Sequence, residues 1–108
     1  MIKEVAFIAI AVSDKERARK FYQETLELKP STTAMEGAWV EYELGATTIG
    51  VGCHPAWQPS RDGTTVAVEV EDIEAAIKKL KERGVHFDLD KTETTVCWMA
   101  PFRDPDGS

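Results

Sequence analysis

Residues 9–24 read AIAVSDKERARKFYQE and residues 67–82 read AVEVEDIEAAIKKLKE, so one pattern occurs twice in the chain, 58 positions apart. Each copy begins with alternating apolar residues, which is typical of a strand, and continues into an acidic cap and a helical spacing. Seven positions are identical in this register: Ala9 and Ala67, Val12 and Val70, Asp14 and Asp72, Glu16 and Glu74, Ala18 and Ala76, Lys20 and Lys78, and Glu24 and Glu82. The repeat predicts two tandem copies of one supersecondary unit.

The first copy contains the signals of one helix and four strands. Residues 4–12 predict a buried strand, and Ser13 with Glu16 forms a Ser-x-x-Glu capping box that opens a helix running to about Thr25. Pro30 cannot continue a helix and suits an edge strand or the start of one. Residues 38–53 predict a hairpin that turns at Gly45.

The second copy follows a linker that is rich in proline and glycine. Residues 65–70 predict a strand, a helix begins within residues 71–74 and ends at Gly84, and residues 85–89 and 95–101 predict two more strands. We therefore expect one α+β domain of two tandem βαβββ modules, whose curved mixed sheets surround a cleft. Module one spans residues 3–53, the linker residues 54–63, and module two residues 64–108, with its final strand absent or truncated at Ser108.

Alternation along the two opening strands separates a core face from a cleft face. The rows predicted to pack under the helices are branched aliphatics: Ile8, Ile10 and Val12 in the first copy, and Val66, Val68 and Val70 in the second. The opposite rows are smaller or polar: Phe7, Ala9 and Ala11, and Thr65, Ala67 and Glu69. The second set of rows is expected to line the cleft.

Composition excludes several classes of protein. The chain is 43% hydrophobic and 30% charged, which is ordinary for a globular domain of 108 residues. A formal net charge of −6 argues against nucleic-acid binding, because a phosphate backbone needs a clustered basic surface. The longest apolar run, residues 5–12, is too short to cross a membrane, and the N-terminus has no signal-peptide pattern. A cytoplasmic protein is expected, in which Cys53 and Cys97 are buried thiols rather than a disulfide bridge.

Three phrases in order point to a known family. Residues 11–22 (AVSDKERARKFY), residues 68–76 (VEVEDIEAA) with Gly84 and Val85, and residues 104–107 (DPDG) resemble the vicinal oxygen chelate superfamily. That superfamily includes glyoxalase, bleomycin-resistance proteins and extradiol dioxygenases. The resemblance implies paired βαβββ modules around a cleft that is commonly completed by dimerisation, so a homodimer is expected. Open sheet edges favour the same outcome.

The metal-dependent members of this superfamily hold a divalent ion with histidines and carboxylates, and those positions can be matched to this chain. The first falls on Phe7, the second on or near Gly50, the third on Thr65, and the fourth beyond Ser108. Phenylalanine and glycine offer no side-chain ligand, and threonine is a poor one. We therefore expect no metal and no other cofactor.

The remaining site candidates are aromatic residues and one acid. Phe7 and Thr65 occupy equivalent places in the repeat, Glu69 shares the parity of Thr65, and a cleft bordered by Trp39, Trp57 or Trp98 would favour a flat aromatic ligand. The first hypothesis is a metal-independent, bleomycin-resistance-like protein that binds a small aromatic molecule. The second is an isomerase or lyase that uses Glu69 as its acid or base. The third is a degenerate accessory or dimerisation module.

The metal expectation is directly testable. Elemental analysis of dialysed protein should find far less than one Zn, Ni, Mn or Fe per chain, because two of the three matched positions lack a donor atom. About one equivalent of any of these metals would overturn this interpretation.

Overall fold

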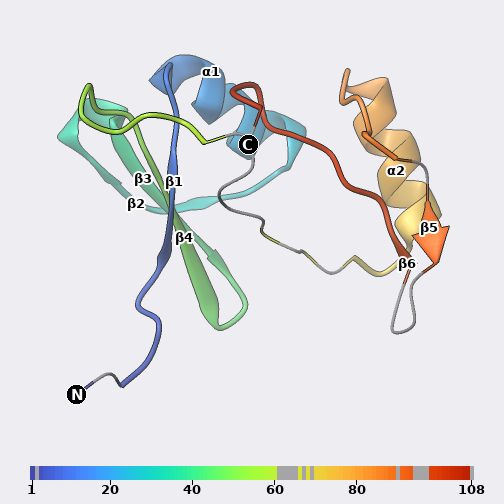
Figure 1. Ribbon diagram of the computed structural model, residues 1–108, viewed down its shortest axis with the longest axis horizontal. Coiled ribbons are helices and arrows are strands. Elements are labelled where there is room, and N and C mark those ends of the chain that lie inside the picture. Colours follow the sequence, from blue (N-terminus) through green and yellow to red (C-terminus); the bar gives the residue numbers. More distant parts are fainter. Residues whose placement is uncertain are drawn as a thin grey trace.

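The computed structural model describes residues 1, 3–60, 66, 68, 70–89, 91–93 and 98–107, and all structural statements refer to these residues. One layer is a four-stranded sheet with the strand order β1-β4-β3-β2, and the first helical segment packs against it (Figure 1). Helix α2 and a two-stranded ribbon, β5 and β6, lie together beside this layer (Figure 1). The family fold of mixed helices and a curved sheet is therefore present, as expected from the repeat.

The sheet belongs to the first module. Strand β1 (Ile8–Ala11) pairs in parallel with β4 (Thr47–Gly52), and β4 pairs antiparallel with β3 (Trp39–Leu44). A short 3₁₀ turn, η2 (Met35–Gly37), joins β3 to the edge strand β2 (Pro30–Ala34). The hairpin predicted to turn at Gly45 is confirmed, since Gly45 has a φ of 63°, a conformation that glycine adopts without strain.

The first helix has the predicted extent but a different cap. It consists of α1 (Lys15–Arg19) and a π-helical continuation, η1 (Lys20–Thr25). The prediction that Ser13 opens the helix is wrong, because the Asp14 carboxylate accepts the Arg17 N–H at 3.0 Å. That hydrogen bond holds the pKa of Asp14 below its usual value. Ser13 is engaged elsewhere, since its N–H and its hydroxyl both donate to Asp106.

Helix α2 (Ile73–Glu82) repeats the same cap. Asp72 accepts the Ala75 N–H at 3.1 Å, and its backbone angles of −135° and 104° nearly match the −140° and 109° of Asp14. The repeat register therefore holds at the level of backbone conformation. The predicted helix end is also confirmed, because Gly84 follows α2 with a φ of 86° and the Val85 N–H returns to the Leu80 carbonyl.

The hydrophobic core lies between the first helix and the sheet. The inward row of β1 is confirmed, because Ile10 and Val12 are buried and Ile8 packs against them. Tyr22 is buried under the helix, where its hydroxyl donates to Asp104 at 3.1 Å and burial raises its pKa. The buried apolar residues are Ile10, Val12, Ala18, Tyr22, Val40, Tyr42, Ile49 and Val51. No helix in the described part of the chain is long and apolar enough to cross a bilayer.

The second module differs from its predicted form. Val66, Val68 and Val70 lie in no strand, and the side chains of Val68 and Val70 are 57% and 46% exposed. The predicted row under α2 is therefore wrong, since alternation assigns faces only where a strand is hydrogen-bonded into a sheet. Val66 packs instead against the core of the first module. Thr65, Ala67 and Glu69 fall outside the described residues.

The pairing of the last part of the chain differs from the prediction. Strands β5 (Thr92–Glu93) and β6 (Trp98–Met99) form an antiparallel ribbon. The strand predicted over residues 85–89 is reduced to one bridge between Phe87 and Phe102. Of the strand predicted over residues 95–101, residues 98 and 99 belong to β6, and residues 95–97 lie outside the described residues.

Polar contacts at both ends of the first helix attach the second module to it. The Arg83 guanidinium donates to the Thr25 carbonyl at 2.7 Å, where the helix leaves carbonyls unpaired, and it also binds the Glu27 carboxylate. This hydrogen bond lowers the pKa of Glu27. At the other end of the helix, Asp106 of the C-terminal turn accepts from Ser13 and from Arg17. Both ends of one helix are thus held by residues from the second half of the chain.

The two aliphatic rows make a matched pair for a stability test. Ile10→Ala should lower the free energy of unfolding by about 2–4 kcal/mol, because it removes packed atoms from the core. Val68→Ala should cost less than about 1 kcal/mol, because more than half of the Val68 side chain is exposed. Urea unfolding of both variants checks this, and equal losses would contradict the assigned faces.

Candidate ligand-binding site

Three aromatic side chains form a cluster on the sheet face opposite the helix. The rings of Phe7 and Trp39 meet edge to face with their centroids 5.3 Å apart. The rings of Trp39 and Trp57 meet in the same way at 5.8 Å. Edge-to-face contact matches the positive ring edge of one residue to the negative ring face of the next. We call Phe7, Trp39 and Trp57 the aromatic cluster.

The cluster depends on two glycines in the adjoining strand. Gly50 and Gly52 of β4 lie opposite Glu41 and Trp39 of β3. A Cβ atom on Gly50 would overlap the six-membered ring of Trp39. A Cβ atom on Gly52 would lie 2.5 Å from Cζ3 of Trp57 and 2.9 Å from Cε3 of Trp39. Glycine at both positions therefore lets the two indoles lie directly on the backbone of the sheet.

A carboxylate fixes the orientation of one of these indoles. Nε1 of Trp39 donates to Oε2 of Glu41 at 2.8 Å. The two residues are two positions apart on β3, so their side chains project from the same face of the sheet. The sequence interpretation missed this role of Glu41. The spacing of an indole and a carboxylate on one strand was the available signal.

Trp57 reaches the cluster from the loop after β4. The backbone N–H of Trp57 donates to the His54 carbonyl at 2.9 Å, and the backbone N–H of Ala56 donates to Nδ1 of His54 at 3.0 Å. The side-chain amide of Gln58 also donates to the Pro55 carbonyl at 3.0 Å. These bonds make residues 54–57 a tight turn that returns the Trp57 ring to Gly52. Trp57 is 43% exposed, so it lies at the surface and not in the core.

An open hollow adjoins the aromatic cluster. It measures about 220 Å³ and is lined by Ala9 and Ala11 of β1 and by Ala56, Trp57 and Gln58 of the loop. Ala9 and Ala11 pair with Gly50 and Gly52 across the two strands, so four neighbouring small residues leave this face of the sheet without large side chains of its own. Flat apolar floors with an aromatic wall suit planar ligands. The volume lies below the usual range for ligand sites, so it fits a small molecule.

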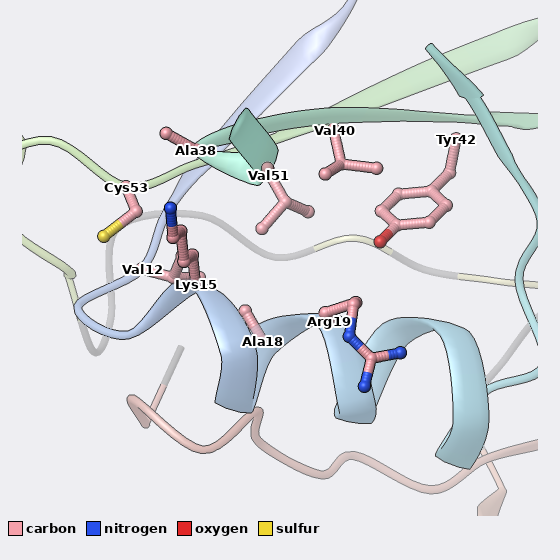
Figure 2. A pocket seen from close by; sticks show the side chains of 10 residues that line it. Val12, Lys15, Ala18, Arg19, Ala38, Val40, Tyr42, Val51 and Cys53 are labelled. Atoms are coloured by element: carbon pink, nitrogen blue, oxygen red, sulfur yellow. The ribbon is translucent and has the colours of Figure 1, made fainter. Parts of the chain in front are cut away.

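A second cavity lies inside the core, between the first helix and the sheet, and Figure 2 shows it from close by. It measures about 10 Å³, enough for about one water molecule. Val40 and Val51 point toward Ala18 across it (Figure 2). Arg19 beside it is already engaged by Glu16 and Glu24. This cavity is a packing gap and not a binding site.

The predicted site residues thus fall into three groups. Phe7, Trp39 and Trp57 come together in the aromatic cluster. Trp98 lies on β6, away from the sheet that carries the cluster (Figure 1), and its ring is covered by the Lys91 ammonium at 4.6 Å. Thr65 and Glu69 lie outside the described residues.

The described residues do not fit the metal centre of the metal-dependent superfamily members. Phe7 and Gly50 present no donor atom, and the indole of Trp39 fills the space over Gly50. In the ranges described by the structure, no group of three or more His, Cys, Asp or Glu side chains is placed to hold a metal ion. An aromatic ring therefore lies where the resemblance places a metal ligand.

Comparison with known proteins gives the family. The model of the Glyoxalase/Bleomycin resistance protein/Dioxygenase superfamily matches residues 4–108. The chain belongs to this superfamily. It is 26% identical to the uncharacterized protein YetH of Bacillus subtilis over 114 aligned positions, covering all of this chain and 95% of YetH.

Two solved structures show the same fold. One is TnmS3, described as an antibiotic binding protein from a Streptomyces species, with a TM-score of 0.80, 28% identity, and coverage of 98% of this chain and 90% of TnmS3. The other is a superfamily member from Sphaerobacter thermophilus, also with a TM-score of 0.80 and 28% identity, covering 98% of this chain and 92% of that protein. The resemblance inferred from the three sequence phrases is therefore confirmed.

The contact between Gly50 and Trp39 generates a coupling test. Gly50→Ala should lower the free energy of unfolding by about 1–3 kcal/mol, because the added methyl displaces the Trp39 ring. In the Trp39→Ala background the same change should cost at least about 1 kcal/mol less, because the clash is gone. A double-mutant cycle measured by urea unfolding checks this. Equal costs in both backgrounds would show that the indole does not lie on Gly50.

Proposed function

We propose that this protein binds a small planar aromatic molecule in the hollow beside the aromatic cluster, without a metal ion. The observation that carries the proposal is the contact of Phe7, Trp39 and Trp57 on a flat floor of glycines and alanines. The glycines and the exposed tryptophan would both lower the stability of the protein if the cluster served packing alone. Glycine weakens a strand, and an exposed tryptophan leaves a large apolar surface in water.

The physical basis of such binding is burial and ring contact. Removing apolar surface from water contributes roughly 25 cal/mol per Å². Contacts between aromatic rings add about 0.5–1.5 kcal/mol beyond that burial. The methyl side chains of Ala9 and Ala11 supply no polar group, so the wall of Trp57 is expected to provide most of the orientation.

The comparisons support binding rather than a particular reaction. TnmS3 is described as an antibiotic binding protein and shares the fold at 28% identity. A glyoxalase/bleomycin resistance protein from the same Streptomyces strain has a TM-score of 0.74 and 27% identity. We therefore propose that the ligand is an aromatic antibiotic, which the protein binds and keeps from its target. We propose that this binding takes place in the cytoplasm, where it would protect the cell.

A homodimer is part of the same proposal. Strand β1 lies at an edge of the described sheet, and Val5, Phe7 and Trp57 beside it are exposed. An open edge next to apolar side chains favours pairing with a second chain. Sedimentation velocity at micromolar concentration should find a dimer, and a clean monomer would contradict this part of the proposal.

Two bicyclic aromatic probes, naphthalene and coumarin, test the binding function. Both should bind with a Kd on the order of 1 mM or tighter, a modest value for ligands of this size. Trp57→Ala and Phe7→Ala should each weaken binding several-fold, because each removes a ring from the site. Trp98→Ala is the matched control and should leave the Kd unchanged, because Trp98 lies on β6 away from the cluster. Equilibrium dialysis gives the Kd values.

Three outcomes would count against the function. The first is failure of the wild-type protein to bind either probe. The second is an equal loss of affinity in the Trp98 control. The third is chemical conversion of a bound aromatic antibiotic, seen by mass spectrometry after incubation, which would favour the alternative of an enzyme.

A further inference from the structure

The two indole N–H groups of the aromatic cluster differ in their hydrogen bonding. Nε1 of Trp39 donates to Glu41, so this donor is satisfied within the protein. Nε1 of Trp57 has no hydrogen-bond partner among the residues that the structure describes, and the side chain is 43% exposed. One of the two donors is therefore free to bind another molecule.

The contacts of Trp57 show which way this donor lies. Cζ3 and Cε3 of Trp57 face Gly52, where an added Cβ would lie 2.5 Å and 2.9 Å from them. In an indole ring, Nε1 lies on the long edge opposite these two atoms. Nε1 is therefore not among the ring atoms that lie closest to Gly52. Trp57 is also one of the residues that line the hollow.

A ligand that covers this N–H displaces the water bound to it. A buried donor left without a partner costs free energy, whereas an acceptor on the ligand replaces the lost hydrogen bond. Sites built in this way reject analogues that lack the matching polar atom more strongly than they reject changes in apolar size. The free donor thus supplies chemical selectivity that the alanine floor cannot.

We propose that Trp57 Nε1 is the hydrogen-bond donor of the site and selects planar aromatic ligands that carry an acceptor oxygen, such as a ring carbonyl. This inference rests on the proposed function and narrows it to one class of ligand. Gln58 also lines the hollow, and one N–H of its side-chain amide donates to the Pro55 carbonyl, which ties that side chain to its own loop. Nε1 of Trp57 has no such bond within the described part of the chain.

The test compares the two probes on two proteins. Coumarin carries a ring carbonyl, whereas naphthalene has a similar flat shape and no acceptor. Trp57→Phe keeps an aromatic ring and removes the N–H. It should weaken coumarin binding about tenfold. The same variant should change naphthalene binding by less than about threefold, because only ring area is lost.

A measurement on the wild-type protein removes any dependence on the folding of a variant. In a ¹H–¹⁵N NMR spectrum, coumarin should shift the indole N–H resonance of Trp57 downfield. Naphthalene should not do so, and the resonance of Trp39 should move less, because its N–H is held by Glu41. The Trp98→Phe variant assigns the third indole resonance.

The outcomes separate this inference from the function on which it rests. If both probes bind and Trp57→Phe weakens them equally, or the Trp57 resonance does not shift with coumarin, the donor assignment is wrong and the binding function stands. If neither probe binds to the wild-type protein, the function and the donor assignment both fail.

Discussion

The alternation of side chains along β4 is the constraint on which the rest of the structure depends. Ile49 and Val51 point into the core, where both are buried, while Gly50 and Gly52 present bare backbone on the opposite face. Strand β4 therefore contributes one face to the hydrophobic core and the other face to the aromatic cluster. The core surface needs branched side chains to fill its volume, and the other needs their absence so that two indoles can approach. Any residue other than glycine at positions 50 and 52 would force Trp39 and Trp57 away from the sheet.

The second half of the chain is attached to this layer by polar groups at the ends of the first helix. Asp106 binds Ser13 and Arg17 near the helix N-terminus, and Arg83 binds the Thr25 carbonyl near its C-terminus. Both contacts follow the sign of the helix dipole, since an anion lies at the positive end and a cation at the negative end. Asp104 adds a bond from the buried Tyr22 hydroxyl. Apolar contacts add to these bonds, because the ring centroids of Phe21 and Phe102 lie 6.5 Å apart and Val66 packs against the core.

The chemistry of the site follows from what replaced the expected metal ligands. Phe7 and the ring of Trp39 over Gly50 give apolar surface where charged donors are required to hold an ion. A surface of this kind interacts with a ligand through ring contact and burial, and neither demands a particular reaction. The function that we propose therefore uses the superfamily fold without the oxygen chelation for which the superfamily is named, since function resides in the site and not in the fold.

Local patterns in the sequence determined the elements of the first module and the turns at Gly45 and Gly84. These features depend on residues within a few positions of one another, so spacing is enough to predict them. The exposure of Val68 and Val70, and the use of Ser13 as a donor to Asp106 rather than as a cap, were decided by contacts between distant segments. The residues of the site divide in the same way. Alternation along the first strand placed Phe7 opposite the core. Only the folded β3–β4 layer shows that the Trp39 ring lies on Gly50 and that Glu41 binds the indole N–H of Trp39. Strand register and the path of a loop are tertiary quantities, because they depend on the free energy of the whole packed layer and not on any one segment.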